Sequence, residues 1–270
     1  MNALAVGALA TLPVVTLEDV ECEAALQTRI DRKYVLTPRA LESVVETCAG
    51  SLQILDIDGE RGFGYRSTYY DTPGLVTYRA AATGRRPRFK VRTRRYLATG
   101  TSWLEVKRRD RHGRTDKHRI GFDDEFEFDR EAIAFLSGFD EVRPHVCQLR
   151  PSLITTYERT TLLSTTSSTS AADQRVTIDR NVECRSIHDA NVTGLGQHLI
   201  VETKSPHDRP GPIDRALWHA GARPVRISKY AIGIATAHPE LPANRWSRVL
   251  RRYIQLTPTR TPLDPEEISP

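Results

Sequence analysis

A row of basic residues marks one short segment of this chain. In the segment 88–94 (Arg-Phe-Lys-Val-Arg-Thr-Arg) every second residue is cationic. Because successive side chains of a β-strand point to opposite faces, this spacing predicts one row on one side of a sheet, formed by Arg88, Lys90, Arg92 and Arg94. Like charges this close repel one another. The row therefore predicts a strongly anionic ligand, such as a polyphosphate.

The same alternation recurs in several other segments. Glu105 and Lys107 share one side of a predicted strand, and so do Glu202 and Lys204. Further pairs and triplets have the same spacing: Arg29, Asp31 and Lys33; Lys117 and Arg119; Tyr157 and Arg159; Arg175, Thr177 and Asp179. One charged face is ordinary at an exposed sheet edge. Its repetition favours a charged interior, although outward-facing ion pairs are the alternative interpretation.

The two carboxylates, Glu105 and Glu202, carry a further clue. Each would repel a phosphate chain unless a divalent cation lay between them. Mg²⁺ and Mn²⁺ prefer oxygen ligands and bridge carboxylates to phosphate oxygens. The residues thus predict a metal-bound polyphosphate or nucleoside triphosphate. The sequence has no Gly-x-x-x-x-Gly-Lys-Ser/Thr loop, which excludes a P-loop mechanism.

The elements that must position these residues are mostly strands. Turn residues bound the predicted strands, which are 29–36, 64–70, 88–96, 102–109, 115–122, 153–163, 175–183, 198–204 and 225–230. Helical spacing predicts four short helices, at 17–26, 38–48, 130–137 and 213–220. Thr37 can cap the second of these, and Pro38 suits its first turn. This pattern predicts an α+β, mainly-β fold, a closed antiparallel β-barrel of about eight strands with peripheral helices.

The composition fits one sizeable domain, with 270 residues, of which 39% are hydrophobic and 27% are charged. A net charge of +5 favours acidic partners. The four cysteines lie far apart, so the sequence predicts neither a zinc site nor a disulfide framework. The apolar stretch 3–15 lacks a basic leader and is too short to span a bilayer. We therefore expect a cytoplasmic protein without a transmembrane segment.

An ordered set of motifs covers most of the chain, at 29–34, 69–73, 78–79, 88–92, 104–107, 201–204 and 227–230. Together these motifs resemble the VTC domain, the catalytic module of eukaryotic vacuolar polyphosphate polymerases and their bacterial relatives, within the triphosphate tunnel metalloenzyme (CYTH-like) superfamily. The resemblance implies a β-barrel tunnel whose basic lining holds a triphosphate or a growing polyphosphate, with a divalent metal, Mn²⁺ or Mg²⁺, held by acidic residues.

The resemblance also suggests roles for individual residues. We assign catalysis to Lys33, Arg92, Lys107 and Lys204. The phosphate-binding candidates, including Arg94 from the row, are Arg88, Lys90, Arg94, Lys117, Arg119, Tyr157, Arg159, Arg175, Ser228 and Lys229. Glu202 matches the family's metal-ligand position, and Glu105 is a second candidate.

One departure bears on the reaction. Superfamily hydrolases tend to begin with a Glu-x-Glu-x-Lys strand, whereas this chain has Arg29-Ile30-Asp31-Arg32-Lys33. The missing carboxylate would help to hold a second metal or to orient a water. We therefore expect transfer of the ATP γ-phosphoryl group to a polyphosphate chain. The alternatives are an inorganic triphosphatase or nucleoside triphosphatase, and a non-catalytic module that binds polyphosphate or inositol polyphosphate.

Domain limits follow from the same patterns. We expect a flexible N-terminus at 1–16, a tunnel domain at 17–240, a basic amphipathic helix at 241–255 and a disordered tail at 256–270. The arginines of that helix suggest contact with a membrane surface or an acidic protein. Nucleic-acid binding is not expected, because Phe89 falls opposite the basic row and Glu105 and Glu202 lie where a nucleic-acid backbone would run.

Overall fold

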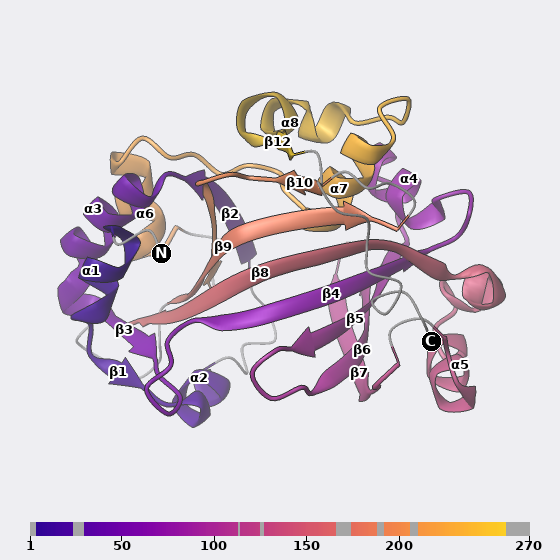
Figure 1. Cartoon of the computed structure of the whole chain (residues 1–270), viewed down its shortest axis with the longest axis horizontal. Helices are drawn as coiled ribbons and strands as arrows, with labels where there is room; N and C mark the ends of the chain where they lie inside the picture. The colour runs from indigo at the N-terminus through magenta and orange to yellow at the C-terminus, as the bar shows by residue number, and fades with distance from the viewer. Residues whose placement is uncertain are drawn as a thin grey trace. The chain divides into compact units, whose positions relative to one another are not determined.

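The computed structural model describes residues 4–23, 30–112, 114–124, 127–165, 174–187, 192–205 and 210–257 (Figure 1). The chain forms two compact units. The first comprises Met1–Phe63, Glu158–Asn181 and Leu195–Arg226, and the second comprises Gly64–Tyr157, Val182–Gly194 and Ile227–Pro270. Two long strands, β8 (Arg150–Ser164) and β9 (Gln174–Ser186), contribute residues to both units.

The first unit combines short helices with two groups of strands. Its helices are α1 (Leu4–Ala10), α2 (Leu17–Glu23), α3 (Pro38–Cys48), the 3₁₀ turn η1 (Ala49–Ser51) and α6 (Pro212–His219). Its strands are β1 (Val14–Val15), β2 (Ile30–Leu36), β3 (Leu52–Leu55) and β11 (Leu199–Ser205), with parts of β8 and β9. Strand β11 pairs antiparallel with both β2 and β9, whereas β3 pairs antiparallel with β8 and parallel with β1.

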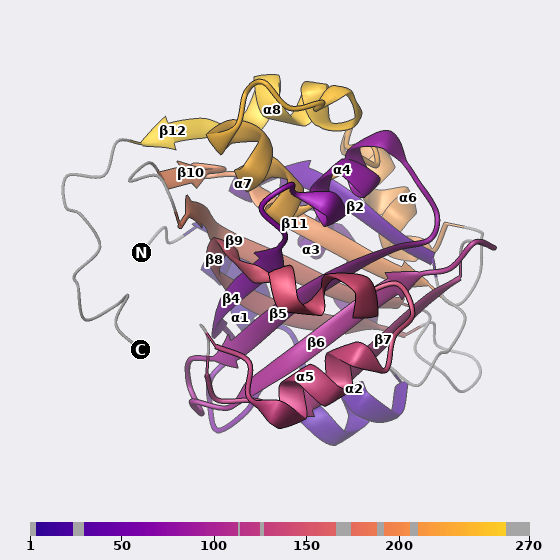
Figure 2. The same cartoon turned by 90° about the vertical axis from the view of Figure 1, so that its right-hand side faces the viewer.

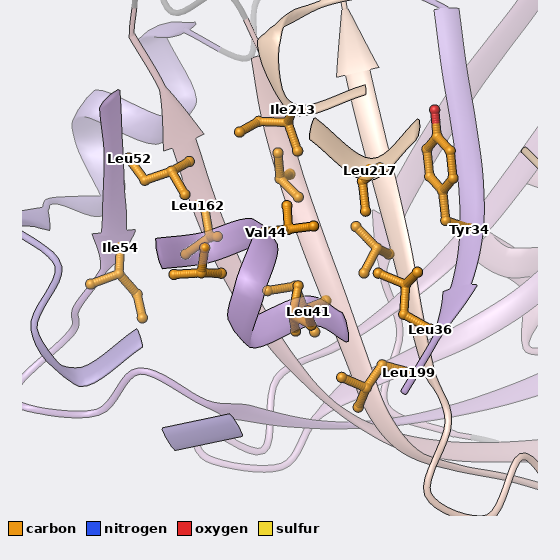
Figure 3. Packing of buried hydrophobic residues seen from close by; sticks show 14 of the residues in the cluster. Tyr34, Leu36, Leu41, Val44, Leu52, Ile54, Leu162, Leu199, Ile213 and Leu217 are labelled. Atoms are coloured by element: carbon orange, nitrogen blue, oxygen red, sulfur yellow. The ribbon is translucent and has the colours of Figure 1, made fainter. Parts of the chain in front are cut away.

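Helix α3 covers the apolar face of these strands. Thr37 caps the helix by accepting a hydrogen bond from the Ala40 amide at 3.3 Å, as the sequence predicts. Its buried residues Leu41 and Val44 pack with Tyr34 and Leu199 of the neighbouring strands (Figure 3). Because side chains alternate along a strand, this packing leaves the opposite faces of β2, β9 and β11 to charged residues.

The second unit is built on four consecutive antiparallel strands, β4 (Phe63–Asp71), β5 (Arg88–Tyr96), β6 (Ser102–Arg109) and β7 (Thr115–Gly121). Figure 2 shows them side by side, with helix α5 (Arg130–Ser137) lying across one face. Phe89, Val91, Leu104 and Val106 point to that face and form a core with Leu136 of α5. The other face is therefore free to carry the basic row.

Shorter elements complete the second unit. They are α4 (Val76–Thr83), η2 (Arg143–Gln148), β10 (Val192–Gly194), α7 (Lys229–Ala237), η3 (Asn244–Trp246), α8 (Ser247–Tyr253) and β12 (Gln255–Thr257). Strand β10 pairs antiparallel with β9 and β12. The second apolar core includes Tyr78 of α4, Tyr230 of α7 and Trp246 of η3.

The mainly-β antiparallel fold with peripheral helices is confirmed. The strand pairing differs from the expected closed barrel in one respect. Among the described residues, β2 pairs only with β11 and β7 pairs only with β6, so the sheet is open at these two edges.

One predicted strand is corrected. The strand predicted at 225–230 is absent, because the Ser228 side chain accepts a hydrogen bond from the Ala231 amide at 3.4 Å and begins helix α7. The N-terminus predicted to be flexible contains α1 and β1. The tail predicted to be disordered begins with the last two residues of β12, and residues 258–270 lie outside the described part. The end of the helix predicted at 17–26 also lies outside it.

The predicted C-terminal helix has its apolar face inside the protein. Trp246 is 6% exposed and Val249 is 2% exposed, and Trp246 packs with the second core. This face is therefore not available for insertion into a membrane surface, whereas Arg248, Arg251 and Arg252 are exposed. In the described ranges, no helix combines the length and the hydropathy that crossing a membrane requires. Cys48, Cys147 and Cys184 are free thiols, and Cys22 is outside the described side chains.

Candidate functional site

The basic row lies on the open face of the β4–β7 sheet. The four residues Arg88, Lys90, Arg92 and Arg94 are half-buried, whereas the residues between them are buried on the opposite face. The strand register extends the row across the sheet, because Arg88 lies opposite Arg109 and Lys90 lies opposite Lys107. Lys107 in turn lies opposite Lys117, and Glu105 opposite Arg119. We call these residues the basic face: Arg88, Lys90, Arg92, Arg94, Lys107, Arg109, Lys117 and Arg119.

A single buried carboxylate lies within the basic face. Glu105 is 2% exposed, and its Oε2 accepts a hydrogen bond from Arg92 Nε at 2.7 Å and forms an ion pair with Arg92 Nη2 at 2.6 Å. Arg94 Nε lies 3.9 Å from the same oxygen, and Lys117 forms an ion pair with Oε1. Burial opposes ionisation of Glu105, but these three cations outweigh burial and hold its pKa well below the usual range. Glu105 is therefore a carboxylate at every physiological pH.

The cations around Glu105 respond to burial as well. Burial lowers the pKa of Lys117 to about 8, although Glu105 favours its charged form. Arg92 keeps its charge, because Glu105 raises its pKa against the effect of burial. The result is a fixed arrangement in which positive charge exceeds negative charge.

Aromatic rings support the guanidinium groups of this face. Arg92 Nη1 donates to the Tyr69 hydroxyl at 3.1 Å. Arg94 lies 5.6 Å from the centre of the Tyr65 ring, and Arg119 lies 4.5 Å from the centre of the Trp103 ring. Cation–π contacts of this kind stabilise by about 0.5–1 kcal/mol each and restrict the side chains. The basic face is thus preorganised by residues that the sequence interpretation did not assign to the site.

The first turn of α7 adds two polar groups. Lys90 Nζ donates to Ser228 Oγ at 2.8 Å, and Lys229 Nζ lies 4.0 Å from the centre of the Tyr157 ring. Tyr157 is 4% exposed, so its ring is a buried support for the lysine. The predicted phosphate-binding residues Ser228 and Lys229 therefore join Lys90 in one neighbourhood.

A buried aspartate holds this turn in place. The Tyr230 hydroxyl donates to Asp71 Oδ2, which also accepts the Tyr78 amide at 3.0 Å. Asp71 Oδ1 accepts the Thr77 amide at 3.0 Å, so one carboxylate ties α7 to the start of α4. The Tyr-Tyr-Asp motif at 69–71 was part of the resemblance, but its positioning role could not be read from the spacing.

A second group of predicted site residues lies on the charged face of β2, β8, β9 and β11 in the first unit. Glu202 lies opposite Lys33 on one side and Thr177 on the other, with 3.6 Å between Lys33 Nζ and Glu202 Oε2. Two residues further along the same strand, Lys204 lies opposite Arg175. We call this set the Glu202 group: Lys33, Arg159, Arg175, Glu202 and Lys204.

Charge is tightly coupled within the Glu202 group. Burial, together with the charges of Arg159 and Arg175, lowers the pKa of Lys204 to about 7, while Glu202 and Asp31 oppose the shift. Arg159 donates to both oxygens of Asp179, at 2.6 and 2.9 Å. Asp179 therefore orients this guanidinium, whereas the sequence pattern had placed Asp179 only on the same face as Arg175 and Thr177.

The two candidate metal ligands differ in their surroundings. Glu202 is 13% exposed and lies 3.6 Å from Lys33, whereas Glu105 is 2% exposed and has Arg92, Arg94 and Lys117 around it. The described residues contain no group of three or more acidic, histidine or cysteine side chains that could hold a metal. Mg²⁺ is often bound by one or two carboxylates with phosphates and waters as the remaining ligands. Glu202 fits that arrangement, and Glu105 fits it poorly.

Comparison with solved structures gives matches of low identity. A proposed adenylyl cyclase from Hippeastrum, described as having a dominant triphosphatase activity, is 13% identical over 77% of this chain and 96% of its own, with a TM-score of 0.43. A conserved hypothetical protein from Pyrococcus furiosus is 12% identical over 76% of this chain and 99% of its own, with a TM-score of 0.41. No curated protein matches the sequence.

A family model described as the VTC domain matches residues 28–238, which is more than half of the chain. All the predicted catalytic, phosphate-binding and metal-binding residues lie within this range. The match supports an enzyme that acts on triphosphates by phosphoryl chemistry, of a kind that generally uses a divalent metal. The chain belongs to the VTC domain family.

Proposed function

We propose that this chain is a metal-dependent phosphotransferase of the polyphosphate polymerase type, which adds the γ-phosphoryl group of ATP to a polyphosphate chain. The observation that carries the proposal is the basic face. Its cations lie in register on adjacent strands, and Glu105 is the one carboxylate that the register places among them on β5 and β6. Such a surface suits a linear ligand that carries at least one negative charge on each of its phosphate groups.

Phosphoryl transfer asks little covalent chemistry of the protein. Positioned cations that stabilise charge on the phosphoryl oxygens account for most of the catalysis. We assign this role to Arg92 and Lys107 of the basic face and to Lys33 and Lys204 of the Glu202 group. The metal, held through Glu202 and phosphate oxygens, would neutralise further charge on the transferred group.

The remaining predicted residues bind the substrate in this proposal. Lys90 and Ser228 already share a hydrogen bond. A phosphate oxygen bound there would therefore accept hydrogen bonds from the Lys90 ammonium and the Ser228 hydroxyl, which belong to different elements. Lys229, supported by Tyr157, adds a third donor. Contacts from rigid elements keep the reacting groups aligned, which is the main requirement of transfer.

Hydrolysis by the same residues is the second candidate. Strand β2 supports transfer over hydrolysis, because it begins Ile30-Asp31-Arg32-Lys33 and Asp31 lies opposite Lys204. Its carboxylate therefore faces a lysine, and the preceding residue 29 is arginine where the hydrolases tend to have glutamate. Fewer carboxylates leave fewer groups to orient a water.

The test is incubation of the purified full chain with ATP and Mn²⁺ or Mg²⁺, followed by assays of acid-labile polyphosphate and of orthophosphate. We expect polyphosphate from the parent protein and a loss of at least tenfold in Glu202→Gln, while the exposed control Glu46→Gln keeps full activity. Orthophosphate without polymer would select the hydrolase. Tight binding without turnover would select the binding module, and an active Glu202→Gln variant would remove the assigned metal ligand.

A further inference from the structure

Four arginines gather at the beginning of β5. Arg88 lies opposite Arg109 in the register of β5 and β6. Arg86 is exposed in the connection between α4 and β5. Arg245 of η3 reaches the same connection, because its Nη1 lies against Gly84, where it would clash with an added Cβ. We call these four residues the outer arginine cluster.

The cluster carries strong positive charge at close range. Burial lowers the pKa of Arg88, and the nearby charges of Arg109, Arg245 and Arg86 lower it further. In the described ranges of the chain, no carboxylate lies within ion-pair distance of Arg86, Arg88 or Arg245. The other end of the β5 row differs, because Glu105 offsets Arg92 and Arg94 there. Positive charge therefore increases along the row towards Arg88.

Arg245 owes its position to a segment that follows the family match. The match ends at residue 238, whereas η3 spans Asn244–Trp246. The ring of Trp246 packs 5.6 Å from that of Tyr78, and the Tyr78 hydroxyl donates to the carbonyl of Pro242 at 3.0 Å. These contacts anchor the segment and hold the arginine beside α4. A residue outside the VTC domain proper thus extends the basic face.

We propose that the outer arginine cluster binds the distal phosphates of a polyphosphate chain that is longer than triphosphate. The proposal rests on the proposed function in one respect, since it takes the basic face to be a phosphate-binding site. A chain that follows the β5 row from Arg92 passes Lys90 and reaches Arg88, about 13 Å away at the spacing of a strand. There, the guanidinium groups of Arg86, Arg109 and Arg245 bind its phosphates. They come from the α4–β5 connection, β6 and η3, respectively.

Inorganic polyphosphate fits this cluster better than a nucleic acid does. Single-stranded nucleic acids bind through aromatic rings that stack on the bases. The rings that anchor the Arg245 segment, those of Tyr78 and Trp246, are 0% and 6% exposed and offer no free face. Guanidinium groups alone recognise the phosphate oxygens.

The test compares the affinities of the full chain for tripolyphosphate and for long-chain polyphosphate. We expect Arg245→Gln to weaken binding of the long chain roughly tenfold, as one charge-assisted contact implies, and to leave binding of tripolyphosphate unchanged. The matched control is Arg251→Gln, an exposed arginine of the following helix, which should change neither affinity. Arg86→Gln, at an exposed position, should repeat the chain-length effect and serves as the second variant if Arg245→Gln does not fold.

If Arg245→Gln lost affinity equally for tripolyphosphate and long-chain polyphosphate, or lost affinity for neither, the proposal would be overturned. Tighter Arg245-dependent binding of single-stranded RNA than of polyphosphate would also overturn it. The proposed enzyme function can fail separately. If the parent protein binds long chains through Arg245 but forms no polymer from ATP, the proposed binding by the outer arginine cluster stands and the proposed polymerase activity is wrong.

Discussion

Glu105 is the residue on which the electrostatics of the basic face depend. It is buried, and Arg92, Arg94 and Lys117 surround it. Removing one partner of a buried ion pair leaves its counterpart uncompensated, which costs more than the pair contributes. Glu105 therefore acts as an internal counter-ion that keeps the cations together when phosphate is absent.

The substitution Glu105→Gln tests this role. We expect the free energy of unfolding to fall by about 2 kcal/mol, less than for a fully buried pair because Arg92 and Lys117 reach solvent. Chemical denaturation with and without tripolyphosphate measures the change. The ligand should restore more stability to the variant than to the parent, because it supplies the missing negative charge.

Asp116→Asn is the control for that experiment. Asp116 pairs with Arg108, but its side chain is 42% exposed, so the free energy of unfolding of this variant should fall by less than about 1 kcal/mol. A Glu105→Gln variant as stable as Asp116→Asn would show that the cations do not need their carboxylate.

Helix α7 is the element that brings Ser228 and Lys229 to the basic face, and it packs unusually close to its neighbours. A Cβ at Gly233 would lie 2.6 Å from Leu153 Cδ2 and 2.9 Å from Cys184 Cβ. Any other residue there would require Leu153, Cys184 or the helix itself to move. Movement of the helix would also displace the turn that holds Lys90 Nζ at 2.8 Å from Ser228 Oγ.

We therefore expect Gly233→Ala to destabilise the protein by about 1–2 kcal/mol, because overpacking outweighs the better helix propensity of alanine. Gly50→Ala is the matched control, since no atom lies within 4 Å of its Cβ position, and it should be neutral or slightly stabilising. Thermal and chemical unfolding of both variants measure the difference. A neutral Gly233→Ala would mean that α7 can shift without cost.

Elements with strong local signals were predictable from the sequence. The alternation in 88–94 gave the correct strand and both of its faces, and Thr37 with Pro38 marked the start of α3. The strand predicted at 225–230 failed because a capping hydroxyl and tertiary burial of Tyr230 outweighed a short β-like pattern. Helix α4 was not predicted, since it begins after Leu75, whose positive φ of 54° has no sequence signal in a leucine.

At the scale of the whole molecule, a net charge of +5 favours polyanions over neutral ligands. A ligand that binds only the folded chain stabilises it by about 2.7 kcal/mol when its concentration is one hundred times its Kd. Tripolyphosphate should therefore raise the Tm in a concentration-dependent way, and added salt should reduce the shift by screening the charges. Sodium chloride at matched ionic strength is the control. An equal shift with sodium chloride would point to general screening and remove the specific site.

The sequence predicted the class of fold and the residue types of the site, but not the connections that hold the site together. Asp71, Tyr69 and Asp179 position cations through contacts between residues far apart in the chain, and no local pattern reports such contacts. The division of β8 and β9 between two units is also set by tertiary packing.

The anchoring of Trp246 has a practical consequence for fragment design. A recombinant fragment trimmed at residue 238, where the family match stops, would leave the ring of Tyr78 without its neighbour and remove Arg245. Such a fragment would expose apolar surface and lose a phosphate contact at once, so a weak result from it would say little about the intact enzyme. Expression boundaries for this protein belong beyond Tyr253, where α8 ends.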